Sequence, residues 1–160
     1  MVRILFLSMV LFGLWSCTKD DLCSEETPTT PLLTIEFLDI TDRLTPKPAN
    51  DLAIRVRDTD STVVYPSVSD VTVAIPLDTE ADQSQFYLID QASSEENLSV
   101  VQLDLFYQRQ DIYVNRACAF KTIYTNMAFE SDQNPLSWIQ DIEILTPTVE
   151  DASVHMYIYH

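Results

Sequence analysis

The sequence predicts an all-β fold, an antiparallel β-sandwich, on three observations. Apolar and polar residues alternate over short segments, which is typical of strands that bury one face. Polar, turn-forming residues separate these segments at about the 8 to 12 residue spacing found in sandwiches and barrels. No segment shows a convincing helical period of apolar residues, so helices are not expected. We expect an immunoglobulin-like sandwich, with a small β-barrel as the alternative.

The expected strands follow one another along the chain. In chain order they are 33–37, 52–56, 62–65, 71–75, 85–89, 98–107, 112–124, 138–145 and 154–160. A turn is expected at 58–61, because Asp and Ser side chains bond their own backbone in turns. The two longest strands are expected to form a hairpin that breaks at the polar segment 108–111. Cys118 then lies in the second strand of that hairpin.

Glycine and charge exclude several classes of function. The chain of 160 residues has a single glycine, Gly13, where average usage would give roughly ten. Phosphate-binding loops, dinucleotide-binding turns, serine nucleophile elbows and EF-hands require glycine at fixed places, so none is expected. The formal net charge is −16, and nucleic-acid phosphates demand clustered Lys and Arg instead. We expect no nucleic-acid partner and no cofactor.

The first seventeen residues resemble the leader of a bacterial lipoprotein. Arg3 is the positive n-region, and the apolar run 4–15 that follows is too short to span a bilayer. Ser16 and Cys17 complete a pattern that resembles a lipobox, in which Cys17 takes a diacylglyceryl group. We expect a lipoprotein signal peptide at 1–16, a lipidated acidic tether at 17–31 and the sandwich domain at 32–160. The alternative is an ordinary secretory signal followed by a coincidental cysteine.

The residues after Cys17 bear on the location of the protein. Lys19, Asp20 and Asp21 resemble the surface-export signal of Bacteroidetes lipoproteins, which indicates an outer-membrane protein that is periplasmic or surface-exposed. The alternative is a solvated acidic tether. The expected partners are the membrane, through the lipid on Cys17, and an envelope protein. The acidic domain itself is expected to be repelled by anionic lipid headgroups.

Two cysteines remain if Cys17 carries lipid. An even remainder, Cys23 and Cys118, in an oxidising compartment indicates one disulfide. In the chain-entropy model, closing a loop of roughly 100 residues stabilises the fold by about 4.7 kcal/mol. The alternative is two buried free thiols. A zinc site is not expected, because no histidine lies near either cysteine.

Metal ligands are few in this sequence. His155 and His160 are five positions apart on an expected strand, so they point to opposite faces and cannot share a metal ion. Asp58 and Asp60 are a weak calcium candidate, since their turn supplies two carboxylates and a hydroxyl where calcium requires several oxygens. The alternative is a solvated turn.

Catalytic and ligand-binding candidates are equally limited. Glu36 and Asp39 are one of several acid pairs that a glycosidase could use, but abundant carboxylates make such pairs commonplace. Tyr65, Tyr124 and Trp138 lie near the ends of expected strands, where they could stack on a sugar or peptide or instead close the rim of the core. We expect no catalytic residue.

Once Gly13 leaves with the signal peptide, the mature chain has no glycine. Left-handed turns then require residues with a side chain, because hairpin turns favour a positive φ that glycine usually supplies. The candidates are Asn50, Asn97, Asn126 and the aspartates. Some turns are expected to be longer instead.

Two segments carry a family resemblance. CTKDDLCSEETPTTP at 17–31 and YVNRACAFKT at 113–122 resemble an uncharacterised family of small flavobacterial lipoproteins, a domain of unknown function. The resemblance implies a lipid anchor at Cys17 and pairing of Cys23 with Cys118, and it implies no activity. That family usually has glycine after its second cysteine, whereas this chain has Ala119, which is expected to remove a backbone bulge.

These inferences predict a class of function rather than an activity. We expect a non-catalytic, lipid-anchored cell-envelope protein that serves as a binding or structural accessory module. The alternative is a carbohydrate-binding or glycan-hydrolysing surface lipoprotein.

Overall fold

The computed structural model describes residues 23–24, 27–94, 96, 98–132 and 137–160. The signal peptide, Cys17 and Asn97 lie outside the described residues. The strands are β1 (Leu33–Leu38), β2 (Leu52–Val56), β3 (Val63–Val68), β4 (Thr72–Ile75), β5 (Gln83–Asp90), β6 (Ser99–Asn115), β7 (Ala119–Ser131), β8 (Asp141–Ile144) and β9 (Met156–Tyr159). The described residues form no helix, and thus none long and apolar enough to cross a membrane.

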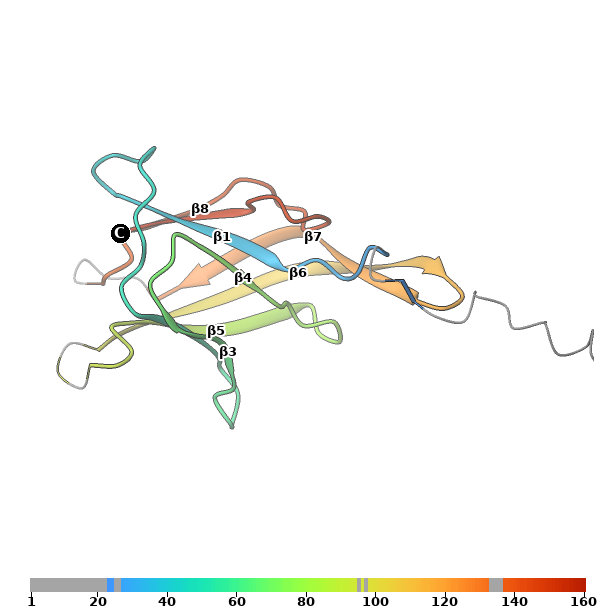
Figure 1. The fold of residues 1–160 in the computed structure, drawn as a ribbon, viewed down its shortest axis with the longest axis horizontal. Coiled ribbons are helices and arrows are strands. Elements are labelled where there is room, and N and C mark those ends of the chain that lie inside the picture. Colours follow the sequence, from blue (N-terminus) through green and yellow to red (C-terminus); the bar gives the residue numbers. More distant parts are fainter. Residues whose placement is uncertain (1–22, 25–26, 95, 97, 133–136) are drawn as a thin grey trace, which may run out of the picture.

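The strands form two sheets that pack face to face (Figure 1). One has the order β4-β1-β9-β8 and the other β3-β2-β5-β6-β7. The predicted sandwich is confirmed, and the two sheets do not close into a barrel. Pairing is antiparallel except between β1 and β9, which run parallel. A parallel pair needs a long connection, and here the rest of the domain supplies it, because β1 and β9 are the first and last strands.

The core lies between the two sheets. The inward-facing side chains of β5 and of the first half of β6 alternate with exposed or half-buried ones, as one-sided burial requires, whereas β1 is buried at every position except Glu36. Each aliphatic or Phe side chain fully buried in this way contributes about 1.5–3 kcal/mol of stabilisation. The largest fully buried side chains are Tyr124, Phe37, Phe86, Leu33, Ile35, Leu52, Ile54, Ile75, Leu88, Leu103, Leu105 and Ile139.

The β6–β7 hairpin is longer than predicted. The expected break at 108–111 is wrong, because β6 continues through this segment for 17 residues in all. All four residues of the segment are exposed. Their polarity therefore reflects an exposed stretch of strand, whose partners Thr122, Ile123 and Tyr124 on β7 are buried, and not a turn. The turn lies at 116–118, which places Cys118 in the turn rather than in the second strand.

Residues with side chains make the left-handed turns, as the absence of glycine requires. Positive φ angles occur at Asp51, Ser61, Gln91, Ala119 and Asn126. The predictions for Asn126 and for an aspartate, Asp51, are confirmed, whereas the prediction for Asn50 is wrong. Ser61, Gln91 and Ala119 adopt a conformation that disfavours a side chain, at a cost of roughly 1–2 kcal/mol each.

Candidate functional site at the hairpin tip

The outer half of the β6–β7 hairpin projects beyond the sandwich (Figure 1). β5 pairs with β6 only from Ser99 to Phe106, and from Gln108 onward β6 pairs with β7 alone among the described strands. We call β6 residues 108–115 and β7 residues 119–125 the arm. Eight strand residues span about 25 Å at ~3.3 Å each. A two-stranded ribbon is only marginally stable by itself, so other contacts must support the arm.

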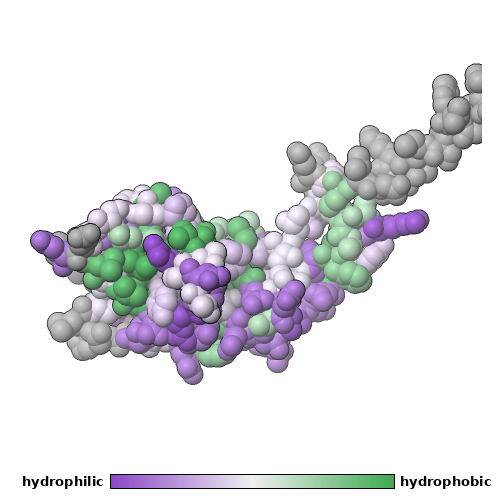
Figure 2. Space-filling model, turned by 90° about the horizontal axis from the view of Figure 1, so that it is seen from below, coloured by the Kyte–Doolittle hydropathy of each residue, from purple (hydrophilic) through white to green (hydrophobic). Residues whose placement is uncertain are grey.

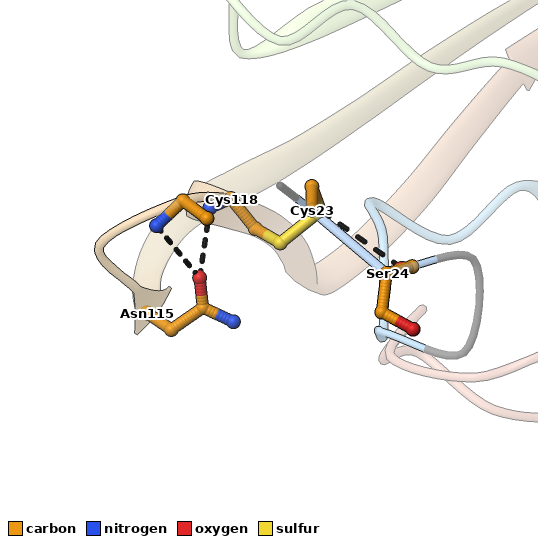
Figure 3. Close-up of a disulfide and its surroundings, with 5 residues drawn as sticks. Cys23, Ser24, Asn115 and Cys118 are labelled. Carbon is orange, nitrogen blue, oxygen red and sulfur yellow. Dashed lines mark hydrogen bonds between the residues drawn. A yellow bond between two sulfur atoms is a disulfide. The ribbon is translucent and has the colours of Figure 1, made fainter. Parts of the chain in front are cut away.

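A disulfide secures the end of the arm (Figure 3). Cys23 and Cys118 are bonded with their Cα atoms 4.9 Å apart, across a sequence separation of 95 residues. This confirms the predicted pairing, and the alternative of two free thiols is wrong. The bond links the start of the described chain to the turn between β6 and β7. We call Cys23 together with residues 113–121 the hairpin tip.

A side-chain cap and a left-handed residue shape the turn of the tip. The Asn115 Oδ1 atom accepts hydrogen bonds from the backbone amides of Ala117 at 2.9 Å and Cys118 at 2.8 Å. Ala119 follows with a φ of 58°, and the β6–β7 register shifts between Tyr113 and Asn115. A three-residue loop closed by a left-handed residue usually makes a bulge with glycine in that position. The expectation that Ala119 removes a bulge is therefore wrong, since alanine adopts the conformation itself.

The N-terminal segment lies against the arm. The Thr122 amide donates to Thr30 Oγ1 at 3.1 Å, and the Thr122 hydroxyl donates to Asp111 Oδ1 at 2.7 Å. Thr122 and Asp111 are cross-strand partners in the arm. Part of the segment that the sequence indicated as tether, 17–31, is thus docked on the domain.

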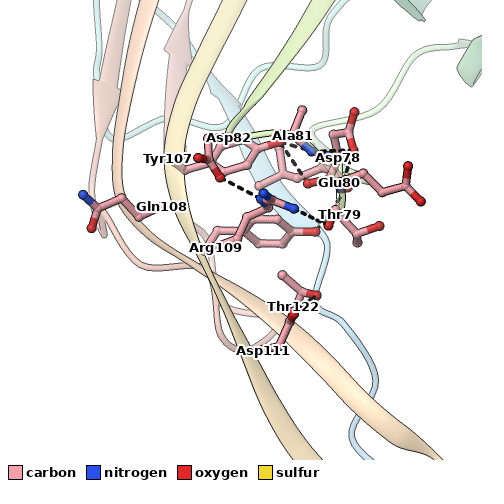
Figure 4. A network of polar contacts seen from close by, with 12 residues as sticks. Asp78, Thr79, Glu80, Ala81, Asp82, Tyr107, Gln108, Arg109, Asp111 and Thr122 are labelled. Atoms are coloured by element: carbon pink, nitrogen blue, oxygen red, sulfur yellow. Dashed lines mark hydrogen bonds and ion pairs between the residues drawn. The ribbon is translucent and has the colours of Figure 1, made fainter.

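Polar contacts hold the root of the arm (Figure 4). The Arg109 guanidinium donates to Asp82 Oδ1 and to the Thr79 carbonyl, both at 2.7 Å. Two residues earlier on β6, the Tyr107 hydroxyl lies 2.6 Å from Ser84 Oγ and accepts a 3.0 Å hydrogen bond from the Asp78 amide. Burial raises the pKa of Tyr107, so this hydroxyl stays protonated. The β4–β5 loop is thereby tied to β6 where the arm leaves the sandwich.

Two aromatic side chains are exposed at the hairpin tip. Tyr113 and Phe120 are cross-strand partners whose rings meet edge to face with centroids 5.4 Å apart. Tyr113 is 60% exposed and Phe120 62% exposed. Figure 2 shows hydrophobic side chains gathered at this narrow end, apart from those of the main body. The described residues therefore leave most of both rings uncovered.

The tip also differs from the rest of the domain in charge. Residues 112–121 contain two cations, Arg116 and Lys121, and no acidic residue. The whole chain carries 25 acidic residues against 9 basic ones. The tip therefore combines exposed apolar rings with positive charge in a strongly acidic protein.

The two histidines have structural contacts in separate places. His155 is completely buried, and its Nδ1 atom accepts the Thr34 amide at 3.1 Å. Burial lowers the pKa of His155 below its usual value. His160 Nε2 lies 3.1 Å from the Lys47 carbonyl oxygen, and its ring contacts Phe37 edge-on. The structure does not bring the two rings together at a common ligand.

The weak calcium candidate lies in an exposed turn. Asp58 accepts hydrogen bonds of 3.3 Å from both the amide and the hydroxyl of Thr62, so both of its carboxylate oxygens have a partner within the turn. Asp60 lies exposed beside it. Within the described ranges, no group of three or more His, Cys, Asp or Glu side chains is placed to hold a metal ion.

The aromatic residues proposed as a binding platform belong to the core or its rim. Tyr124 is fully buried and donates to the Leu77 carbonyl at 3.2 Å. Trp138 is half-buried and stacks on Phe37 with ring centroids 6.2 Å apart. Tyr65 is half-buried at the edge of the core and donates to Asp70 at 3.3 Å. These three side chains close the core and form no exposed platform.

A shallow hollow on the outer face of the five-stranded sheet gathers carboxylates. Asp104 forms an ion pair with Arg57 at 2.9 Å and accepts an amide hydrogen bond from Gln85 at 3.1 Å. Glu130 lies opposite Asp104 across the β6–β7 ladder. Arg57 thereby neutralises the charge of Asp104. The third acid at the hollow, Asp132, accepts the Gln102 backbone amide at 2.6 Å, so two of the three acids take part in structural contacts.

Sequence reasoning missed the aromatic pair at the tip. Tyr113 lies three residues before the turn at 116–118 and Phe120 two residues after it, and the register shift between Tyr113 and Asn115 makes them partners. Correct placement of the turn alone therefore does not predict that they face each other. With the hairpin break expected at 108–111, both residues belong to one expected strand, so the sequence prediction does not contain this pair.

Comparison with known proteins identifies a family without an assigned activity. A family model described as a family of unknown function, DUF6452, matches residues 51–160. No curated protein and no solved structure matches the chain. The matched region holds strands β2 to β9 and the whole arm, including Cys118. Since the match covers more than half of the chain, the protein belongs to this family of unknown function.

Proposed function

We propose that the protein is a non-catalytic, lipid-anchored protein of the cell envelope whose β-sandwich serves as a binding or structural accessory module. The observation that carries the proposal is the Cys23–Cys118 disulfide. It joins the turn between β6 and β7 to Cys23, which lies only six positions after Cys17.

The disulfide supports a location outside the cytoplasm. Disulfides persist in oxidising compartments and are rare where cytosolic reductants act. The leader provides the route for export, and acyl chains on Cys17 provide the attachment. Each buried CH₂ of an acyl chain contributes about 0.8 kcal/mol, so two or more chains give stable anchoring. The Lys19-Asp20-Asp21 segment supports the outer membrane as the destination.

The arrangement of the domain supports an accessory role. Six residues of extended chain reach about 20 Å, so lipid on Cys17 holds the hairpin tip close to the membrane. The opposite end of the sandwich, with the exposed 39–48 loop, then faces away from the membrane (Figure 1). Both histidines take part in structural contacts, His155 with the Thr34 amide and His160 with the Lys47 carbonyl.

Metabolic labelling tests the anchor. The full chain is expressed in a bacterial host that processes lipoproteins, with an alkyne-bearing fatty acid in the medium. We expect the wild-type protein to carry the label and to sediment with membranes, and Cys17→Ser to do neither. The matched control is the double variant Cys23→Ser/Cys118→Ser, which should keep the label. An unlabelled wild-type protein, or a labelled Cys17→Ser protein, would refute the anchor.

A further inference from the structure

The fold itself gives no reason for the exposed aromatic pair at the hairpin tip. Among the described residues, Tyr113 and Phe120 are the aromatic side chains that are largely exposed, and they lie side by side. Elsewhere in the described chain the aromatic residues pack on the core or lie half-buried. Exposed apolar side chains that are gathered at one place typically mark a contact surface.

The covalent connection at the tip indicates what this surface contacts. Cys23 is bonded to Cys118 in the turn of the arm, and Cys17 precedes Cys23 by six positions. The intervening chain reaches at most about 20 Å. Lipid on Cys17 therefore confines the aromatic pair to the neighbourhood of the membrane surface. We propose that Tyr113 and Phe120 insert into the interfacial layer of the bilayer that holds Cys17, so that the arm lies between the membrane and the sandwich.

The chemistry of the tip suits that layer. Tyrosine is enriched at membrane interfaces, where its ring is among the acyl chains and its hydroxyl remains with the headgroups. Arg116 is exposed in the turn, and Lys121 follows Phe120. Such long side chains bury their stems and keep their charge at the headgroup level. Residues 112–121 bring no carboxylate that would have to be desolvated.

Electrostatic attraction is not the source of this contact. Residues 19–26 carry four acidic residues and one lysine, which offsets the cations of the tip. The body of the domain is acidic and is repelled by anionic lipid. Beyond the buried Thr122, residues 112–115 of β6 extend the hairpin by about 13 Å, which is more than the Debye length of about 8 Å at physiological ionic strength. The tip contact is weak alone, and the lipid anchor makes it effective by raising the local concentration.

The inference rests on the proposed lipid anchor, and fluorescence of the full lipidated chain tests both. Trp138→Phe leaves the processed protein without tryptophan, because Trp15 belongs to the signal peptide. In that background, Phe120→Trp places a probe at the tip. The matched control is Leu44→Trp, an exposed apolar position, 89% accessible, in the 39–48 loop at the other end of the molecule. Both proteins are reconstituted into phosphatidylcholine vesicles and floated on a density gradient.

We expect both proteins to float. The Phe120→Trp emission should shift to shorter wavelength and should be quenched by lipids brominated in the acyl chain, whereas Leu44→Trp should show neither effect. Vesicles with added phosphatidylglycerol should leave this difference in place. Thermal melting checks that each variant is folded, and the Tyr113→Trp variant provides a second probe position at the tip.

The possible failures are distinguishable. Flotation with both probes accessible to an aqueous quencher would overturn the tip contact and leave the anchor standing. Absence of flotation would overturn the anchor and, with it, the tip contact. In the absence of vesicles, the emission of the tip probe could shift to shorter wavelength as the protein concentration rises. That result would show that a second copy of the chain covers the pair, and it would also overturn the proposal.

Discussion

The backbone amide of Thr34 donates a 3.1 Å hydrogen bond to Nδ1 of His155, joining β1 to the start of β9 across 121 residues. The histidine is completely buried. For Nδ1 to accept this bond it must carry no proton, so the neutral ring with its proton on Nε2 is the form that fits. Protonation of His155 would remove the acceptor and place a charge in the core.

Stability should therefore fall as the pH drops below about 6.5. Burial lowers the pKa of His155 and outweighs the opposing charge of Asp151. The unfolded chain takes up a proton near pH 6.5, whereas the folded chain takes it up at a lower pH. The contribution of His155 is thus complete above pH 7 and is lost between pH 6.5 and its folded pKa. Thermal melting from pH 8 to pH 5 measures it.

His155→Asn is the control for this effect, because its Oδ1 atom can accept the same amide hydrogen bond without titrating. The variant is expected to melt at a lower temperature overall, since it packs less well. Its melting temperature should change less between pH 7 and pH 5 than that of the wild-type protein. Equal pH dependence in the two proteins would show that other groups are responsible.

Replacing Ala119 by glycine should stabilise the protein. A left-handed φ of 58° costs an L-residue about 1–2 kcal/mol that glycine avoids. Glycine also gives the unfolded chain more conformational freedom, which offsets about 0.4–1 kcal/mol of this gain. We expect a net gain of up to about 1 kcal/mol in the free energy of unfolding, measured with urea. Ala117→Gly, in the same turn but without a positive φ, should instead be neutral or destabilising. The same gain in both variants would disprove the explanation.

Removal of the disulfide should loosen the arm before the sandwich. The double variant Cys23→Ser/Cys118→Ser is expected to lose about 2–4 kcal/mol of stability. Hydrogen exchange should accelerate most at residues 116–122, and much less at the β5–β6 pairs. Reductant should reproduce the loss in the wild-type protein and have no effect on the double variant. Uniform acceleration through both sheets would mean that the bond supports the whole fold.

The sequence predicted strand positions best where apolar and polar residues alternate. The alternation at β1 and β2 placed both strands to within a residue of their observed ends. It was misleading at residues 108–111 of β6, because all four are exposed and no buried side imposes alternation there. There the polar segment 108–111 resembled a turn, while the true turn at 116–118 lacked glycine and proline.

The candidate site was only partly predictable for a related reason. Counting cysteines was sufficient to pair Cys23 with Cys118, since the argument does not depend on where the strands lie. The exposure of Tyr113 and Phe120 depends on the extent to which β5 covers β6, and that is a property of the sheet rather than of the local sequence. Likewise, Ala119 gave no local signal of a left-handed conformation, because the closing of the turn imposes it.

Loss of the Tyr107 hydroxyl should destabilise the root of the arm more than loss of the Tyr124 hydroxyl. The two rings contact each other with centroids 4.9 Å apart, so Tyr107→Phe and Tyr124→Phe are closely matched changes. The Tyr107 hydroxyl contacts Ser84 Oγ and both the amide and the carbonyl of Asp78, and of these the amide keeps Ser84 Oγ as a second acceptor. The Tyr124 hydroxyl makes one bond, to the Leu77 carbonyl. Leaving buried partners unsatisfied costs about 1–3 kcal/mol, so we expect about 2 kcal/mol for Tyr107→Phe and about 1 kcal/mol for Tyr124→Phe. Urea unfolding measures both, and a larger loss in Tyr124→Phe would contradict the assignment of the anchoring contacts to Tyr107.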